Sequence, residues 1–110
     1  MPSATRSARV FHAVADPTRR AILDELCRSP RPVNDIAGLF PVSRPAISRH
    51  LRVLRRARLV REERRGRQRI YRLEASPLSE LDHWLEQYRQ YWTINLMNLK
   101  NHLEKGDKTP

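Results

Sequence analysis

Three capping residues, Asp16, Ser43 and Ser76, divide the chain into short helical segments, and a proline directly follows two of them. The side chain of an aspartate or serine accepts a hydrogen bond from a free amide in the first turn of a helix. Proline suits the first helical position, because the N–H that it lacks would have no partner there. The sequence therefore predicts that helices begin near residues 17, 44 and 77.

Apolar residues recur three and four positions apart in the first four expected helices, which is the spacing of one buried helix face. A break over residues 29–32 (SPRP) precedes a short third helix over residues 33–40, and a turn at residues 41–43 leads into a fourth over about residues 44–57. Two helices joined by a tight turn form a helix-turn-helix. The expected buried residues are Val10, Phe11 and Val14, then Ile22, Leu23 and Leu26, then Ile36, Leu39 and Phe40, and finally Ile47, Leu51 and Leu54.

A β-hairpin and one long helix are expected to complete the chain. Residues 59–64 and 69–73 are strand candidates on either side of a glycine-containing turn, so residues 59–73 predict a wing. The last helix is expected over residues 77–104 and would span about 40 Å. A small domain cannot cover the apolar face of so long a helix by itself, which favours pairing with a second copy of the chain. Residues 1–6 and 105–110 are expected to be loose ends.

The fold class that follows is mainly α with a small β-hairpin. Its order is four helices, two strands and one helix, in a single domain over residues 1–110. This is the order of a winged helix-turn-helix.

The positive charge of the chain is concentrated in one segment. The formal net charge is +10, and residues 44–72 contain twelve arginines against two acids, Glu62 and Glu63, whereas the remaining ten basic and ten acidic residues cancel. A charged run is often only a solvated surface, and an arginine-rich genome would explain the choice of arginine over lysine. Neither explanation accounts for the confinement of the excess positive charge to residues 44–72. The location fits a surface that contacts nucleic-acid phosphates, although net charge by itself also allows an anionic membrane surface.

The periodicity of the fourth helix orients its basic residues. If its apolar residues face the core, arginines and a serine lie on the opposite face; arginine can bond bidentately to guanine, and serine can contact a base edge or a phosphate. Residues near the N-terminal end are expected to read bases, and wing arginines to contact the backbone or an adjacent minor groove. The expected DNA-binding residues are Ser43, Arg44, Pro45, Ser48, Arg49, Arg52 and Arg56 on the helix and Arg64, Arg65, Arg67 and Arg69 on the wing.

Several separated motifs resemble the ArsR/SmtB family of winged helix-turn-helix repressors. They are residues 11–26 (FHAVADPTRRAILDEL), residues 43–51 (SRPAISRHL), and Leu59-Val60 ahead of Gly66-Arg67 and Tyr71. The resemblance covers about residues 8–75. It implies a cytosolic bacterial or archaeal homodimer, paired through its first and last helices, that represses by occupying promoter DNA. The expected dimer interface includes Phe11, Leu81, Trp84, Leu85, Tyr88, Tyr91, Trp92, Leu96 and Leu99.

Many members of this family sense metals, and the chain departs from both familiar ligand patterns. The site on the third helix uses a Cys-x-Cys arrangement, whereas residues 31–37 (RPVNDIA) contain no cysteine. The site on the last helix uses an Asp-x-His pair followed by His and Glu; here Asp82 and His83 are adjacent, and His102 and Glu104 do not have the required spacing. We therefore expect no metal and no cofactor, as in the metal-free, autorepressor-like branch, with a metal- or thiol-responsive repressor as the alternative.

Two single residues allow both a structural and a functional interpretation. Cys27 lies four residues after Leu23 and is expected to pack at the end of the second helix, with redox or metal sensing as the alternative. His50 is at an edge of the apolar stripe, where a phosphate contact and a structural hydrogen bond are equally acceptable. The aromatic residues of the last helix are more typical of dimer packing than of a ligand pocket.

The sequence also argues against several functions. The chain starts without an apolar secretory segment and its longest uncharged stretch is residues 90–99, so we expect a cytoplasmic protein without membrane contact. It has no phosphate-binding glycine loop and no nucleophile motif, so we expect no enzyme. We expect a sequence-specific DNA-binding regulator whose partners are double-stranded DNA and a second copy of itself. The alternatives are a sequence-indifferent nucleic-acid-binding or architectural protein and a protein-interaction module. The operator, the regulated genes and any effector do not follow from the sequence.

Overall fold

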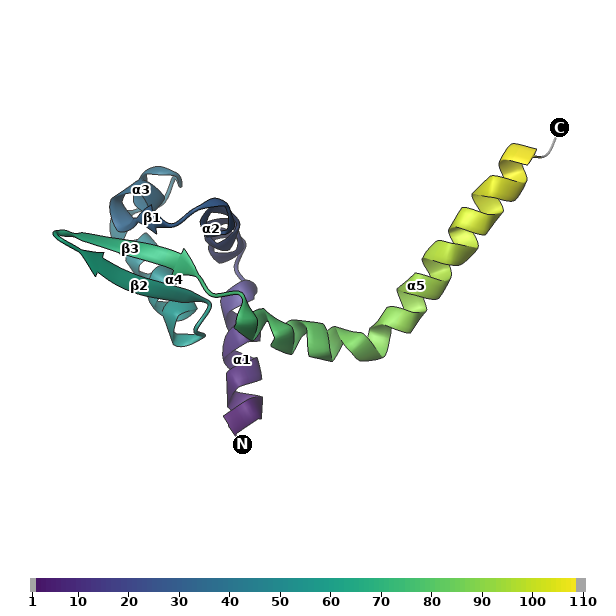
Figure 1. Cartoon of the computed structure of the whole chain (residues 1–110), viewed down its shortest axis with the longest axis horizontal. Coiled ribbons are helices and arrows are strands. Elements are labelled where there is room, and N and C mark those ends of the chain that lie inside the picture. Colours follow the sequence, from purple (N-terminus) through teal and green to yellow (C-terminus); the bar gives the residue numbers. More distant parts are fainter. Residues whose placement is uncertain (1, 109–110) are drawn as a thin grey trace.

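The structure, a computed structural model, describes the backbone of residues 2–108 and the side chains of residues 5–93 and 99–104. It is mostly helical with a small sheet, as predicted (Figure 1). The elements are α1 (Pro2–Val14), α2 (Pro17–Arg28), β1 (Arg31–Pro32), α3 (Val33–Gly38), α4 (Arg44–Arg56), β2 (Val60–Arg65), β3 (Gln68–Leu73), the 3-10 turn η1 (Ser76–Leu78) and α5 (Ser79–Lys108).

Two of the three predicted helix starts are confirmed by their caps. The Arg19 amide donates to Asp16 Oδ2 at 3.0 Å, and the Ala46 amide donates to Ser43 Oγ at 3.2 Å. The third start is two residues too early, because Ser76 opens the turn η1, which has no side-chain cap, and α5 begins at Ser79.

The sheet contains one strand more than the sequence predicts. Its order is β1-β3-β2, all antiparallel, and β1 pairs Arg31 with Tyr71 and Pro32 with Ile70. Prolines on both sides of Arg31 favour the extended backbone that a short edge strand needs, and an edge strand tolerates a residue without an N–H. The segment over residues 29–32, which was predicted as a break between helices, therefore contains the additional strand, β1, at the edge of the sheet.

The predicted wing is confirmed as the hairpin β2–β3. Its outermost pair is Arg65 with Gln68, which leaves a two-residue turn whose first residue, Gly66, has φ +61°. Two-residue hairpin turns require a positive φ at this position, and glycine adopts it without a steric cost.

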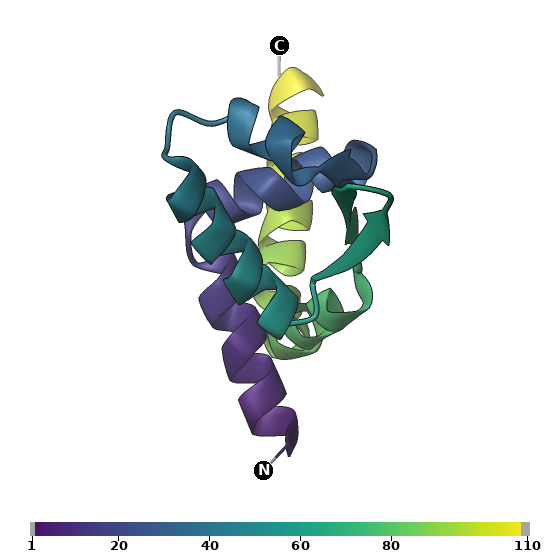
Figure 2. The same ribbon diagram turned by 90° about the vertical axis from the view of Figure 1, so that its left-hand side faces the viewer.

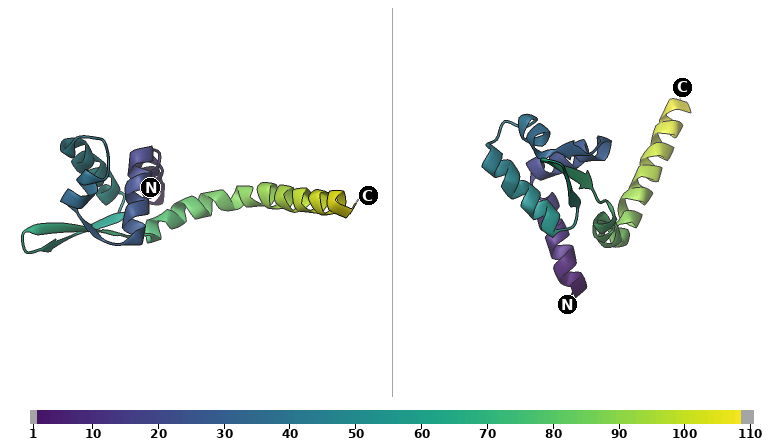
Figure 3. Two further views of the ribbon diagram at one scale, coloured as in Figure 1. Left: turned by 90° about the horizontal axis from the view of Figure 1, so that it is seen from above. Right: turned by 60° about the vertical axis from the view of Figure 1, so that its left-hand side comes forward.

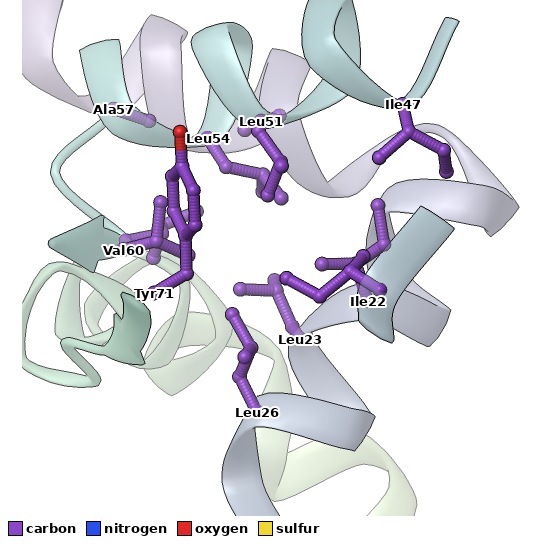
Figure 4. Close-up of a cluster of buried hydrophobic side chains, with 12 residues drawn as sticks. Ile22, Leu23, Leu26, Ile47, Leu51, Leu54, Ala57, Val60 and Tyr71 are labelled. Carbon is purple, nitrogen blue, oxygen red and sulfur yellow. The ribbon is translucent and has the colours of Figure 1, made fainter. Parts of the chain in front are cut away.

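The core lies where α2, α3 and α4 meet the sheet (Figure 4). Burial of Ile36 and of the predicted stripes of α2 and α4 is confirmed. Val10 is buried as well, whereas Phe11, Val14 and Phe40 are only half-buried. Leu39 is 46% exposed, because α3, which was predicted to reach residue 40, ends at Gly38 and Leu39 is its C-cap. The core residues labelled in Figure 4 are Ile22, Leu23, Leu26, Ile47, Leu51, Leu54, Ala57, Val60 and Tyr71.

The prediction of loose ends is wrong over most of both segments. Helix α1 begins at Pro2, and α5 continues to Lys108. A helix extends readily past its first turn, since each further residue adds a hydrogen bond for one residue fixed. Near their crossing, Ser7 Oγ of α1 donates to Glu80 Oε2 of α5 at 2.7 Å, which ties the two helices together.

Helix α5 gives the molecule an elongated shape. The hairpin and α5 extend to opposite sides of the helical body (Figure 3). The radius of gyration is 19.1 Å, whereas a compact chain of this length has about 13 Å. Among the residues of α5 whose side chains the structure describes, most of those beyond its first turns are therefore exposed within the protomer.

Candidate nucleic-acid interface

Helix α4 exposes the face that carries the predicted base-reading residues. Ile47, Leu51 and Leu54 are buried at 1% exposure or less, so the opposite face of the helix points to solvent. Each of the seven residues predicted here is exposed: Ser43, Arg44, Pro45, Ser48, Arg49, Arg52 and Arg56.

Strand pairing divides the wing arginines between two faces. Val60 and Tyr71 are buried, and Arg64 and Arg69 pair across the hairpin on that same face, because side chains alternate along a strand. Arg65 lies on the opposite face. Two of the four predicted wing residues therefore share the face of the sheet that is directed at α4.

Residues of helix α4 and of the hairpin line the two sides of a groove. Its volume is about 340 Å³, and among the described residues no acidic side chain lines it. The groove brings together predicted residues from both elements, and it adds Asn34, Arg55 and Gln68, which the sequence analysis did not select. The lining residues are Pro32, Val33, Asn34, Arg44, Ser48, Arg52, Arg55, Arg67, Gln68, Arg69 and Tyr71.

Glu62 neutralises arginines at the base of this groove. Its carboxylate forms a close ion pair with Arg55, lies 3.5 Å from Arg69 Nε and accepts a hydrogen bond from the Tyr71 hydroxyl at 3.2 Å. Burial, followed by the charge of Glu62, raises the pKa of Tyr71 above its usual 10.0, so this hydroxyl stays a donor.

Glu63 has the same effect on the outer face of the hairpin. Arg72 Nε lies 3.1 Å and Arg65 Nη2 3.4 Å from Glu63 Oε2. The hydrogen bond from Arg72 lowers the pKa of Glu63 below its usual 4.5. Within the described part of the chain, six predicted arginines of α4 and the wing have no acidic partner: Arg44, Arg49, Arg52, Arg56, Arg64 and Arg67.

Arg56 lies away from the groove. It lines a separate hollow of about 320 Å³ with Arg9 and His12 of α1 and Val53 of α4. Five of the eleven predicted DNA-binding residues therefore line the groove, and Arg56 lies beside α1. The other five are outside the lining of the groove: Ser43, Pro45, Arg49, Arg64 and Arg65.

Arg19, to which the sequence patterns assigned no role, connects three helices. Arg19 is 9% exposed; its Nε donates to the Ala13 carbonyl at 2.7 Å and its Nη2 to the His12 carbonyl at 2.8 Å. Its Nη1 lies 3.3 Å from His50 Nδ1 on α4. Arg19 precedes Ile22 by three residues, so its place on the buried face of α2 was a signal available in the sequence.

This network assigns a structural contact to His50. Besides Arg19, Asp16 Oδ2 lies 3.9 Å from His50 Nδ1. The pKa of Asp16 is lowered from 3.8, first by the hydrogen bond from the Arg19 amide. Of the two interpretations open for His50, the structural hydrogen bond is the one that the geometry provides.

The prediction that Cys27 packs in the core is wrong. Cys27 is exposed, because the buried face of α2 ends at Leu26. Over the part of the chain that the structure describes, no three histidine, cysteine or acidic residues come together as a metal site.

Helix α5 carries a wide exposed apolar face. Trp84 contacts Phe11 of α1 edge to face, with ring centroids 5.3 Å apart, and contacts Tyr88 at 5.2 Å. Phe11, Leu81 and Leu85 are half-buried, and the side chain of Leu96 lies outside the described residues. The other predicted interface residues are exposed: Trp84, Tyr88, Tyr91, Trp92 and Leu99.

The helices α3 and α4, joined by a short turn and followed by the hairpin, define the winged helix-turn-helix class of DNA-binding transcriptional regulators. Among the residues described, no helix has the length and apolar character needed to cross a membrane.

Comparison with known proteins agrees with this class. Residues 16–62 match the family described as bacterial regulatory protein, arsR family. The chain is 40% identical over 102 residues to the HTH-type transcriptional regulator Rv2034 of Mycobacterium tuberculosis, covering 92% of each. It is 40% identical over 76 residues to the transcriptional repressor SdpR of Bacillus subtilis, covering 69% of this chain and 84% of that protein.

The fold of the chain is also similar to that of a solved structure. The ArsR-like transcriptional regulator from Rhodococcus sp. RHA1 matches with a TM-score of 0.71 at 34% identity, over 92% of this chain and 95% of that one. The chain belongs to the arsR family of bacterial regulatory proteins. It is a DNA-binding transcriptional regulator and not an enzyme, and the predicted family is confirmed.

Proposed function

We propose that the protein is a homodimeric repressor that binds an inverted-repeat operator in the bacterial cytoplasm. Helix α4 of each protomer enters a major groove, and the wing contacts the adjacent phosphate backbone. The observation that carries the proposal is the groove in which Arg44, Ser48 and Arg52 of α4 face Arg67 and Arg69 of the wing without an acidic side chain among the lining residues.

The dimensions and chemistry of α4 support base reading. A helix with its side chains is about 10–12 Å across, which matches the major groove of B-DNA at about 12 Å. Arg44, Pro45 and Ser48 lie in the first turns of α4, at the end that reads base edges in helix-turn-helix proteins. Arg49 and Arg52 follow on the same exposed face and have the fork geometry that guanine recognises.

The apolar face of α5 supports the dimer. Tyr91 is 62% and Leu99 54% exposed within one protomer, and aromatic surface of this kind is typical of interface cores. A two-fold axis relates the two copies of α4 in such a dimer, so the operator has matching two-fold symmetry. The two half-sites then lie about 34 Å apart along the DNA, or a multiple of that distance. The name of the Bacillus subtilis relative, a repressor, supports repression as the outcome of binding.

The test begins with the operator, which is found by sequencing DNA fragments that the purified protein selects from genomic DNA. Binding titrations at several salt concentrations then compare this operator with a scrambled duplex of the same length. We expect a clear preference for the operator and a steep salt dependence, because arginine contacts release counterions. Equal affinity for both duplexes would overturn the proposal in favour of a sequence-indifferent DNA-binding protein.

Two variants separate base reading from backbone contact. Arg52→Ala is expected to weaken operator binding by about 1–3 kcal/mol and to relax the sequence preference, since it removes a base contact. Arg67→Ala is expected to weaken operator and scrambled DNA alike and to reduce the salt slope by about one per protomer. Lys100→Ala, which removes an exposed charge on the distal part of α5, is the control and should match the wild type. Equal loss on both duplexes for Arg52→Ala would exclude Arg52 as a base reader.

A further inference from the structure

Four arginines outside the groove form a second basic surface, here called the flank patch. Arg6 and Arg9 come from α1, Arg56 from the last turn of α4, and Arg58 from the residues that follow it. They line one hollow of about 290 Å³ with Thr5 and Ala57, and none of the residues that line it is acidic. All four arginines are exposed.

Within the described residues, the arginines of the flank patch have no acidic partner, whereas their neighbours do. Arg55 pairs with Glu62, and Arg61 Nη2 lies 2.6 Å from Glu74 Oε1. Four like charges around one hollow repel one another, and a bound anion removes that repulsion. Arg6 and Arg58 also border an adjoining hollow that Glu74 and Glu80 line, but Glu74 pairs with Arg61 and Glu80 accepts from Ser7. Within the described residues, the hollow of the flank patch therefore keeps the charge of an anion-binding surface.

The backbone at Arg58 supports a role for its side chain. Arg58 has φ +61°, and it ends α4 with two hydrogen bonds, from its own amide to the Arg55 carbonyl and from the Leu59 amide to the Leu54 carbonyl, both at 3.0 Å. This is a Schellman motif, whose left-handed residue is usually glycine. An arginine is strained in this left-handed conformation, whereas glycine is not. The side chain of Arg58 is exposed, so it makes no packing contacts that would offset the strain.

The flank patch continues the DNA-facing side of α4. Arg52 lines the groove, and Arg56 lies one turn further along the same face of the helix. With 13 residues, α4 is about 20 Å long, which exceeds the width of the major groove at about 12 Å. When its N-terminal turns read bases, its C-terminal end lies over the phosphate backbone that borders the groove. Helix α1 lies alongside this end of α4 and adds Arg6 and Arg9 (Figure 2).

We propose that the flank patch binds phosphodiester oxygens of double-stranded DNA outside the major groove that α4 reads. The inference rests on the proposed function and adds to it a second contact surface, made mainly by α1 and by the residue that ends α4. It predicts affinity without sequence preference, because phosphates carry no sequence information directly.

The experiment compares two double variants that remove the same charge. Arg9→Gln with Arg58→Gly neutralises the patch, and Arg28→Gln with Lys100→Gln removes two exposed cations elsewhere, each next to a glutamate. Binding to the operator and to a scrambled duplex is measured over a range of salt concentrations. We expect the patch variant to lose affinity severalfold on both duplexes, with a salt slope smaller by about one for each arginine removed from each protomer. The control variant should keep the wild-type affinity and slope.

A folding defect is separated from a binding defect by thermal unfolding. Arg58→Gly should unfold at the wild-type temperature or above, because glycine adopts the positive φ without strain. If it unfolds at a lower temperature, the pair Arg6→Gln with Arg9→Gln, on the exposed side of α1, replaces it and is expected to show the same loss of DNA affinity and salt slope.

The outcomes also distinguish this inference from the proposed function. If the wild type has no preference for the operator, the proposed function fails. If the wild type has that preference but the patch variant matches the control variant in affinity and slope, only the flank patch is overturned. A loss confined to the operator would also overturn it, because it would mean that the patch reads sequence and not phosphates.

Discussion

At the scale of single residues, Arg19 shows how a charged side chain can serve as the connection between helices. Its guanidinium donates to two carbonyls at the C-terminal end of α1, Ala13 and His12, and its third nitrogen faces His50 of α4. The free carbonyls at the end of a helix need donors, and a planar fork provides several at once. Arg19 therefore helps to hold α4 at a defined position relative to α1, which is also part of the expected dimer interface.

We expect Arg19→Lys to lower the free energy of unfolding by roughly 2 kcal/mol, since the buried carbonyls lose charged donors that a single ammonium cannot replace. Operator affinity should fall while the salt slope stays at its wild-type value, because Arg19 is buried and contacts no phosphate in the proposed complex. Chemical denaturation and salt-dependent titrations measure the two effects. Arg20→Lys, at the exposed neighbouring position, is the control; a stability loss as large as that of Arg19→Lys would contradict the special role of Arg19.

At the scale of elements, the hairpin presents different chemistry on its two faces. The face towards α4 places Arg64 opposite Arg69, a like-charged cross-strand pair that disfavours the hairpin by itself. Glu62 compensates for part of this charge and also pairs with Arg55 of α4. One carboxylate therefore joins the wing to α4 and, by the same contacts, reduces the charge available for DNA.

We expect Glu62→Gln to strengthen binding to scrambled DNA severalfold and to steepen the salt slope, since it releases Arg55 and Arg69 to contact phosphates. The amide oxygen can still accept from the Tyr71 hydroxyl, so the hairpin should persist. Glu63→Gln removes the same charge from the outer face and should have a smaller effect on the affinity. Titrations of both variants over a range of salt concentrations test this, and an equal gain for the two would show that net charge alone, and not the groove, controls the affinity.

At the scale of the whole molecule, α5 determines the elongated shape and leaves the apolar surface that a single protomer cannot cover. Its first turns are fixed to α1 through Ser7 and Glu80 and through Phe11 and Trp84. The remainder leads away from the body of the protein (Figure 1). A dimer that covers this face would fix the distance between the two copies of α4, so dimerisation and operator recognition are expected to be coupled.

We expect Tyr91→Glu to shift the protein towards a monomer, because the charge would be desolvated in the apolar interface. Operator affinity should fall with it, since each protomer then binds only one half-site. Gln90→Glu adds the same charge one residue earlier, on the other face of α5, and should leave the dimer intact. Native mass and operator titrations at matched protein concentrations measure both effects. A wild type that is already monomeric, or a Tyr91→Glu variant that stays dimeric, would contradict this role of α5.

Local sequence patterns were sufficient for most of the fold and for much of the candidate site. The caps at Asp16 and Ser43 involve residues three apart, and helical periodicity identified the buried stripe that turns Arg49 and Arg52 outward. These features depend on interactions within a few residues of the chain, so they can be deduced without knowing the rest of the molecule. The concentration of arginines over residues 44–72 is likewise a property of the sequence.

Contacts between distant residues were decided only by the tertiary structure. They include the pairing of Arg31 with Tyr71, the burial of Arg19 against α1 and α4, and the separation of Arg56 from the groove. Each depends on which elements pack together, and the packing energy is shared among residues that no short sequence pattern connects. The sequence by itself therefore determined which helices form and which of their faces are basic, while the tertiary structure determined which of the described arginines pair with an acidic side chain.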